Sequence, residues 1–427
     1  MIKFSDTEKA IPLWENFAKK TSPELAEAMK DYYSIYDAEL VSWYAELYDP
    51  KIGGFYYSPS ARDNEKCVWK DKEYILLPDA ESTCQALGFI GSSGIAKAVG
   101  NDYVKFLPDW MKKQIADFIY GLQDEDGFFY HPQWGKNIAV SRRARDFNWS
   151  RSMLERLGRP MRYPTMLDNE KKEDKDSGFI PEHLQSKEAF VKYLDSFDLA
   201  TGAYSAGNTL SSQFAQIKSQ GLDDILIDFL NAHQHADSGH WHGTTNYFAI
   251  NGLMKISGIY NAKGIVLPHS YEAAMSAVNA IASPETVNAT VDLWNIWVAI
   301  TNICSGLLEF GGEEGKATVD SIRRELWQIA VPAVKATKEK IYPFKRSDHG
   351  YSYCKGYPSP ISQGAPVCVP YLDEGDINGC VIATVYMVGM VYSALGISGE
   401  DRVPLYGADE AKMFLDILER NNKKVNG

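Results

Sequence analysis

Four carboxylic residues stand where two apolar segments begin, one early in the chain and the other near its C-terminus. They are Asp79, Glu81, Glu374 and Asp376. Paired carboxylates that face each other across a cleft are what acid–base hydrolysis of a glycosidic bond requires. We therefore expect the four groups to converge on one cavity, with two carboxyl groups about 5–10 Å apart.

The same positions also suit the ends of helices. Asp79 and Asp376 lie where an N-cap residue belongs, and Asp is a preferred N-cap. Glu81 and Glu374 lie close to the first turn, where the helix dipole favours anions. A purely structural role is therefore the alternative to catalysis for all four carboxylates.

A histidine and a tyrosine form a second set of catalytic candidates. His242 and Tyr247 flank the opening of another apolar segment, with Asn246 between them. In β-elimination from an acidic sugar, a neutral imidazole or a phenolate removes the C5 proton, and an amide or Arg neutralises the carboxylate. We expect His242 and Tyr247 to face the cavity of the carboxylates; a solvent-facing histidine is the alternative.

Further candidates for substrate binding lie in loops and helix openings that should share one end of the fold. They are Arg62, Asp63, Arg142, Trp241, Asn246, Gln363 and Asn378. Arg142 belongs to the basic run 141–145, which is either a solvated face or an anion pocket. His233 and His235 with Asp237 could bind a metal, but their spacing matches no strong motif. The sequence therefore predicts no metal and no cofactor.

A recurring order of helix, polar cluster, glycine and aromatic residue indicates the elements that position these side chains. The glycines of this repeat are Gly53, Gly127, Gly202, Gly239 and Gly350. A helix ends at little cost when the next residue can adopt positive φ, which glycine does readily. The aromatic residue that follows can fill the junction between the helix and its neighbours. A repeat of this kind indicates an architecture built from similar helical units.

Between these turns, apolar residues recur with helical spacing and predict pairs of helices. The amphipathic outer segments are 23–48, 102–123, 186–199, 222–235, 269–283 and 314–341. The more apolar inner segments are 80–93, 139–157, 208–220, 244–260, 287–306 and 375–396, and a last helix covers 406–422. The pairing predicts an all-α fold, an (α/α)6 toroid of six helical hairpins in one domain over residues 1–427. Its long loops should lie at one end of the ring and carry the function.

The repeat resembles a known class of toroid. Gln123-x-x-x-Gly127-x-Phe129 is similar to the glutamine–glycine–aromatic repeats of terpenoid cyclases and protein prenyltransferases. The run 78–87, Pro-Asp-Ala-Glu-Ser-Thr-Cys-Gln-Ala-Leu, is similar to the segment that opens inner helices there. The resemblance implies the toroid architecture. It does not carry over the chemistry, because Asp79-Ala80-Glu81-Ser82 replaces the Asp-x-Asp-Asp of class II cyclases. Neither an Asp-Asp-x-x-Asp motif nor the prenyltransferase zinc ligands can be placed.

Composition limits the partners and the compartment. The net charge of −12 argues against nucleic acid and anionic membranes as partners. The first residues contain no apolar run of a secretory signal, and the six cysteines are scattered, so we expect a cytoplasmic protein with reduced thiols. The apolar run 381–397 is barely long enough to cross a bilayer, and we expect a buried helix there. The sequence does not determine the oligomeric state.

The polar rim, the missing isoprenoid motifs and a content of 25 Tyr, 18 Phe and 10 Trp favour one function. We expect a carbohydrate-active enzyme, a glycoside hydrolase or a lyase, that acts on a polar small-molecule or oligosaccharide substrate in the mouth of the toroid. The first alternative is a terpenoid-cyclase- or prenyltransferase-like enzyme on an apolar substrate, which an oily cavity with a single buried acid would favour. The second is a non-catalytic toroid that binds a ligand or a protein, which an exposed apolar patch would favour.

Overall fold

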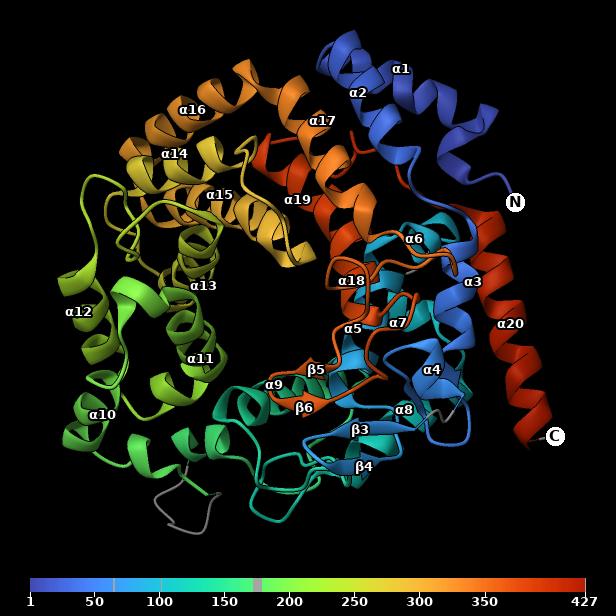
Figure 1. The fold of residues 1–427 in the computed structure, drawn as a ribbon, viewed down its shortest axis with the longest axis horizontal. Coiled ribbons are helices and arrows are strands. Elements are labelled where there is room, and N and C mark those ends of the chain that lie inside the picture. Colours follow the sequence, from blue (N-terminus) through green and yellow to red (C-terminus); the bar gives the residue numbers. More distant parts are fainter. Residues whose placement is uncertain (64–65, 101, 172–178, 427) are drawn as a thin grey trace.

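The computed structural model describes residues 1–426 except 64–65, 101 and 172–178. The described chain is mostly helical, as the sequence predicts, with three short antiparallel strand pairs (Figure 1). The strand pairs are β1 (Tyr48–Asp49) with β2 (Gly54–Phe55), β3 (Cys67–Trp69) with β4 (Lys72–Tyr74), and β5 (Ile361–Ser362) with β6 (Ala365–Pro366).

One set of helices surrounds the middle of the molecule (Figure 1). They are α5 (Ala80–Ser92), α9 (Val140–Arg156), α11 (Leu199–Ser219), α13 (Tyr247–Lys263), α15 (Thr290–Phe310) and the continuous run of α18 (Ile377–Val381), the π-helical turn η6 (Ile382–Tyr386) and α19 (Met387–Ala394). Each helix packs against the next in this order, and α18 packs against α5.

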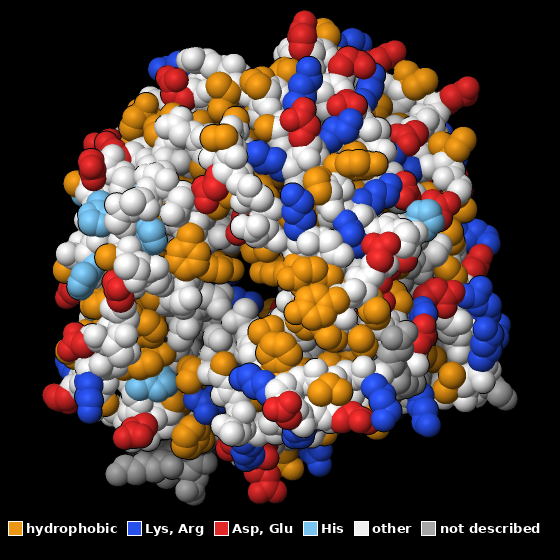
Figure 2. All heavy atoms as spheres, in the orientation of Figure 1, with side chains coloured by type: hydrophobic (Ala, Val, Ile, Leu, Met, Phe, Trp, Pro, Cys, Tyr) orange, Lys and Arg blue, Asp and Glu red, His pale blue; other side chains and the backbone are white. Residues whose placement is uncertain are grey.

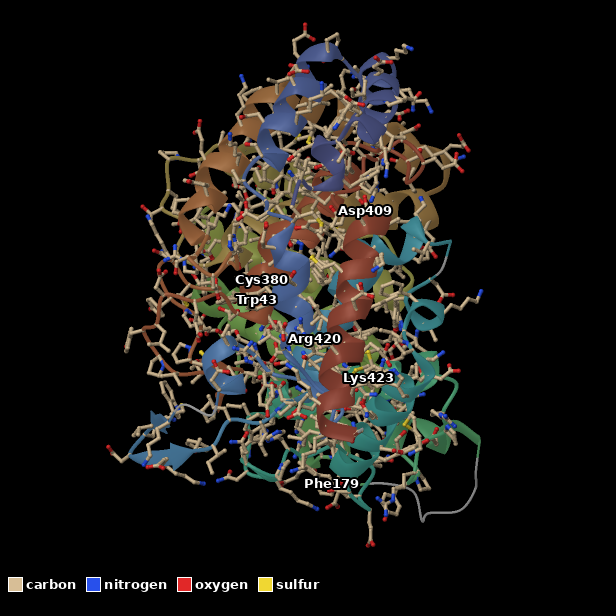
Figure 3. All side chains as sticks on the ribbon, turned by 90° about the vertical axis from the view of Figure 1, so that its right-hand side faces the viewer. Trp43, Phe179, Cys380, Asp409, Arg420 and Lys423 are labelled. Atoms are coloured by element: carbon tan, nitrogen blue, oxygen red, sulfur yellow. The ribbon has the colours of Figure 1, made fainter. Side chains whose placement is uncertain are left out.

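Amphipathic helices lie at the periphery (Figure 1). The longer ones are α1 (Ile11–Lys20), α2 (Pro23–Tyr33), α3 (Glu39–Glu46), α8 (Asp109–Leu122), α10 (Lys187–Leu194), α12 (Asp223–His233), α14 (Ser270–Ala280), α16 (Gly312–Gln328), α17 (Ala330–Ile341) and α20 (Ala408–Asn426). Short helices are α4 (Pro59–Arg62), α6 (Ile95–Ala98) and α7 (Tyr103–Phe106). Figure 3 shows α20 running along α3, where Arg420 pairs with Glu46.

Several predicted segments differ from the observed helices. The segment 23–48 is divided into α2 and α3, the segment 102–123 into α7 and α8, and the segment 314–341 into α16 and α17. A further difference concerns Gly202, which lies inside α11 at a kink with φ −121° and ψ 20° and makes no turn. The helix already begins at Leu199 because the Asp198 carboxylate accepts hydrogen bonds from the backbone of Ala200 and Thr201.

Two helices have the length and composition of membrane spans. They are α15 and the run Ile377–Ala394. Of their most apolar windows, 67% and 78% respectively are buried inside the protein. Both are therefore core helices of this fold, which agrees with the burial expected for the apolar run near the C-terminus.

The turn at Gly127 shows why this position needs glycine. Gly127 has φ +86°, and a Cβ there would lie 2.4 Å from the carbonyl oxygen of Pro164. The Gln123 side chain holds the same two segments together, since its amide oxygen accepts from the backbone of Arg162 and Tyr163 and its amide nitrogen donates to the Tyr163 carbonyl. The glutamine and the glycine of the repeat thus join the end of an outer helix to the chain that leads to the next hairpin.

A pair of glycine substitutions tests this role. Gly135 also has positive φ, +57°, but nothing lies within 4 Å of its virtual Cβ. We expect Gly135→Ala to cost about 1–2 kcal/mol, the strain of a left-handed alanine. Gly127→Ala should cost about 1–3 kcal/mol more, because the Pro164 carbonyl must also move. Denaturant unfolding of the two variants measures the difference, and equal losses would show that the contact with residue 164 is unimportant.

Candidate functional site

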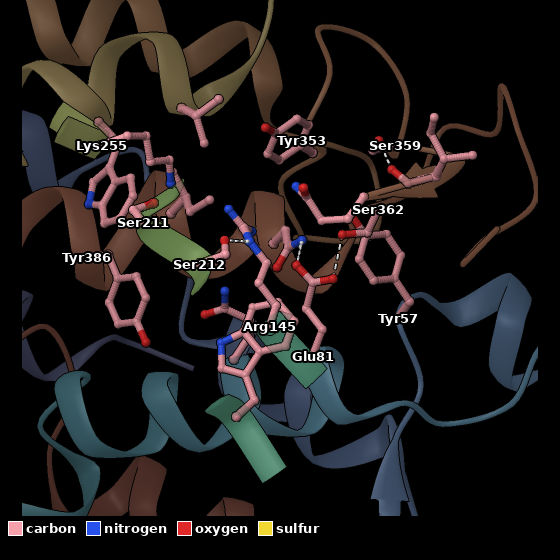
Figure 4. A pocket seen from close by; sticks show the side chains of 18 of the residues that line it. Tyr57, Glu81, Arg145, Ser211, Ser212, Lys255, Tyr353, Ser359, Ser362 and Tyr386 are labelled. Carbon is pink, nitrogen blue, oxygen red and sulfur yellow. Dashed lines mark hydrogen bonds between the residues drawn. The ribbon is translucent and has the colours of Figure 1, made fainter. Parts of the chain in front are cut away.

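A cavity of about 360 Å³ lies between the inner helices and the loop that carries β5. Figure 2 shows a hollow near the middle of one face of the molecule, with hydrophobic side chains along its edge and a basic side chain inside it. Six aromatic residues line the cavity: Tyr57, Trp149, Tyr204, Trp294, Tyr353 and Tyr386. Its polar lining includes Glu81, Gln85, Arg145, Asn148, Lys255, Gln363 and Asn378 (Figure 4). The size and the mixed lining are typical of a site for a small polar ligand.

Arg142, directly behind one wall of the cavity, is the centre of a buried charge cluster. Arg142 and Asp146 are four residues apart in α9 and therefore lie on the same face of the helix. The Nε atom of Arg142 is 3.0 Å from the Asp146 carboxylate. The two terminal nitrogens donate to α5, with Nη1 2.8 Å from Glu81 and Nη2 2.9 Å from Asp79. The Arg142 side chain is fully buried, so its guanidinium is the fixed countercharge of three carboxylates.

One guanidinium supplies a single positive charge to three carboxylates. Burial raises the pKa of Asp146 to about 7, and the neighbouring Asp79 and Glu81 act in the same direction. Asp79 and Glu81 also accept hydrogen bonds from other groups. Arg142 is thus buried and not on a solvated face, and the anions that its guanidinium contacts are the protein's own side chains.

Glu81 is the predicted catalytic residue that reaches the cavity (Figure 4). Its Oε1 accepts a hydrogen bond from the Asn378 amide at 2.9 Å, and its Oε2 accepts from Arg142 and from the Ser362 hydroxyl. Asp79 caps α5 by accepting from the backbone of Glu81 and Ser82. Asp79 is therefore a helix cap, as the structural alternative predicts, and it also pairs with Arg142. Glu81 caps no helix among the described hydrogen bonds.

Asp376 lies at the start of α18, which packs against α5, and Glu374 lies against α4, but both carboxylates bind the backbone. Asp376 caps α18 through the Gly379 amide at 2.7 Å and accepts from the amides of Tyr353 and Ser359. Glu374 accepts from the backbone and the hydroxyl of Ser60. Burial raises the pKa of both groups, for Asp376 to about 7. The two carboxylates fix the loops that form the cavity wall and are not among its lining residues.

His242 and its neighbours lie apart from this cavity. Trp241 is buried and donates its indole N–H to the Leu230 carbonyl at 2.7 Å, so it fills the junction between α12 and α13. The half-buried His242 bonds to the main chain of Thr244, and Asn246 caps α13. Because Trp241 takes the inward position of this turn, its neighbour His242 remains near the surface.

Tyr247, Arg62 and Asp63 also lie elsewhere. Tyr247 lines a second depression and accepts a hydrogen bond from Lys340. Arg62 and Asp63 pair with each other at the end of α4, with Nε and Oδ1 2.7 Å apart. The expected convergence of His242 and Tyr247 with the four carboxylates is thus not observed. Of the predicted residues, Glu81, Gln363 and Asn378 line the cavity, and Arg142 and Asp79 support its wall.

Two cations in the cavity were not among the predicted site residues, although Arg145 belongs to the basic run 141–145, for which the sequence predicts either a solvated face or an anion pocket. Arg145 donates from Nε to the Ser212 hydroxyl at 3.2 Å and from Nη2 to Asn208, and its guanidinium lies 5.7 Å from the Trp149 ring centre. Lys255 extends from the middle of α13 into the cavity (Figure 4). A lysine in the centre of an apolar helix and an arginine one turn before a tryptophan are the sequence signals that could have identified them.

The environment changes the protonation of Lys255. Burial lowers the pKa of the Lys255 ammonium to about 7, and the charge of Arg145 acts in the same direction. Glu81 acts in the opposite direction without forming an ion pair with it. Lys255 can therefore take up or release a proton near neutral pH, a property that suits an acid–base or anion-binding group.

Within the described part of the chain, no group of three or more His, Cys, Asp or Glu residues is arranged to hold a metal ion. Comparison with known proteins assigns no relatives: no protein-family model matches the chain, and no curated protein matches it. The cavity itself is therefore the basis for a functional proposal.

Proposed function

We propose that the helical pairs close into an (α/α)6 toroid. The support is the sequence of contacts from α5 through α9, α11, α13 and α15 to α19, with α18 packing against α5 again. In such a ring the N-terminal ends of α5, α13 and α18 would share one end. The polar cavity, which takes Glu81 from α5 and Asn378 from α18, would then be the mouth of the toroid.

We infer that the protein is a carbohydrate-active enzyme, a glycoside hydrolase or a lyase, that binds a polar sugar in this cavity. The observation that carries the proposal is the composition of the cavity lining, which combines six aromatic rings with carboxylate, amide, hydroxyl and basic groups. Aromatic rings offer flat apolar surfaces for the C–H faces of a sugar ring, and the polar groups can bond its hydroxyls. An isoprenoid chain would leave these polar groups without partners, at a cost for each.

The carboxylates favour elimination over hydrolysis. Glycoside hydrolysis ordinarily uses two carboxyl groups that flank the bond, about 5–10 Å apart. Glu81 is the one carboxylate in the described lining, and its oxygens are engaged by Arg142, Ser362 and Asn378. Lys255, by contrast, is poised to exchange a proton near neutral pH.

Substitution of a lining tryptophan tests the proposal. Trp149 lines the cavity, and Trp327 is a half-exposed residue of α16 that serves as the matched control. We expect Trp149→Ala to weaken binding of a sugar oligomer about tenfold or more, the effect of losing at least 1.4 kcal/mol of stacking. Trp149→Phe should retain most of the binding, and Trp327→Ala should change nothing. If the wild type and Trp149→Ala bind the sugar oligomer with equal affinity, the sugar site lies elsewhere.

A further inference from the structure

Two cationic side chains enter the central cavity without an anionic partner. Arg145 uses Nε and Nη2 for neutral oxygens of α11, and Nη1 makes no hydrogen bond to the described residues. Lys255 makes neither a hydrogen bond nor an ion pair within the described part of the chain. Arg142 differs from both, because three carboxylates occupy its guanidinium.

The two cations are close enough to affect each other. The charge of Arg145 disfavours protonation of Lys255 across the cavity, and both side chains reach toward the same space in Figure 4. Like charges that face each other in a partly dry site repel, so the arrangement is costly until an anion enters between them. Arg145 is also held in place by Ser212, Asn208 and Trp149, so its guanidinium is preorganised for that anion.

We propose that Arg145 and Lys255 form a subsite for an anionic group, and that the sugar which the cavity accepts is therefore acidic, with a carboxylate as in a uronic acid. This substrate class rests on the proposed carbohydrate-active function and narrows it. The free Nη1 of Arg145 and the Lys255 ammonium supply N–H donors to the carboxylate oxygens. The aromatic rings of Trp149 and Tyr353 remain available to the sugar ring.

Calorimetric titration with a uronic acid disaccharide and its neutral counterpart tests the subsite. We expect the wild type to bind the acidic disaccharide at least about tenfold more tightly, since hydrogen bonds to a charged group exceed those to neutral ones. Arg145→Gln and Lys255→Met should each lower the ratio of acidic-sugar affinity to neutral-sugar affinity toward one. Arg143→Gln is the matched control, because this neighbouring arginine of α9 lies against Phe128 and Phe179.

A sugar phosphate and inorganic sulfate, titrated in parallel, distinguish the source of the anion. Tighter binding of the sugar phosphate than of the uronic acid would overturn the assignment of a carboxylate. Equal binding of acidic and neutral sugars by the wild type would overturn the subsite but leave the proposed function intact. Binding of neither sugar would remove the proposed function itself. Circular dichroism of each variant establishes that it is folded, and Lys255→Arg, which keeps the charge, should retain the preference for acid.

Discussion

Replacing Arg142 with methionine is expected to lower the free energy of unfolding by about 3–5 kcal/mol. The methionine replaces the aliphatic stem of the arginine but leaves Asp79, Glu81 and Asp146 buried without a countercharge. The loss should increase with pH. Burial already raises the pKa of Asp146 and the charge of Arg142 lowers it, so removal of the guanidinium raises this pKa further. A group whose pKa is higher in the folded than in the unfolded state contributes stability at low pH that is lost as pH increases. Denaturant unfolding at several pH values measures both effects.

The adjacent Arg143 provides the control for this experiment. Its guanidinium lies 5.3 Å from the Phe128 ring centre and pairs with no carboxylate in the described ion pairs, so Arg143→Met should cost less than about 1 kcal/mol. Adding Asp146→Asn to Arg142→Met should recover part of the loss, because it removes a buried carboxyl that must be protonated before the protein can fold. Similar stabilities of the two methionine variants at every pH would show that the buried cluster contributes nothing to the fold.

Affinity for an acidic sugar is expected to fall as pH rises above about 7. Below that value Lys255 is protonated in the free protein and can contact the anion, given its pKa of about 7. Above it, binding must first protonate the amine, at a cost of about tenfold in affinity for each pH unit. A bound anion raises the pKa of Lys255. The affinity therefore stops falling once the pH exceeds this higher pKa of the complex. Titrations from acidic to alkaline pH, with proton uptake measured in two buffers, follow this directly.

Two variants separate Lys255 from other titrating groups. Lys255→Met should bind weakly with little pH dependence in this range. Arg145→Gln should move the decline to higher pH, because the charge of Arg145 lowers the pKa of Lys255. Glu81 and the tyrosines Tyr204 and Tyr353 also line the cavity, but their substitution should not remove the decline. A wild-type affinity that is constant between pH 6 and about 9, or a decline that survives in Lys255→Met, would contradict the role of the lysine.

The all-α character and most helix positions could be predicted from the sequence because apolar periodicity is a local property. The observed α5 and α9 begin within about one residue of the predicted segments. Gly202 shows the limit of the glycine rule, since a glycine followed by an aromatic can also lie in a kinked helix. At the turn of Gly350, the residue with positive φ is His349, at 68°, and not the glycine. Glycine is needed at position 350 for a different reason, because a Cβ there would lie 2.9 Å from the Cα of Gly375.

The site was harder to predict because side-chain direction depends on tertiary packing. Asp376 occupies a position that suits either a cap or a catalyst, and only the positions of Tyr353 and Ser359 show that its oxygens serve the backbone. His242 is turned from the cavity because Trp241 fills the core. Arg145 and Lys255 are distant in sequence and have no motif in common, so their meeting across the cavity follows from the packing of α9, α11 and α13 alone.

Mass spectrometry of the products from an acidic oligosaccharide tests the central claim most directly. Elimination transfers the C5 proton to a base, forms a C4=C5 double bond, and breaks the C4–O bond, whose oxygen leaves with a proton. The two fragment masses then sum to the mass of the substrate. Hydrolysis adds one water to that sum. We predict that the wild type cleaves the acidic oligosaccharide without gaining water, and that combined Arg145→Gln and Lys255→Met substitutions abolish this cleavage. Cleavage that gains water, or that persists in the doubly substituted protein, would contradict the account.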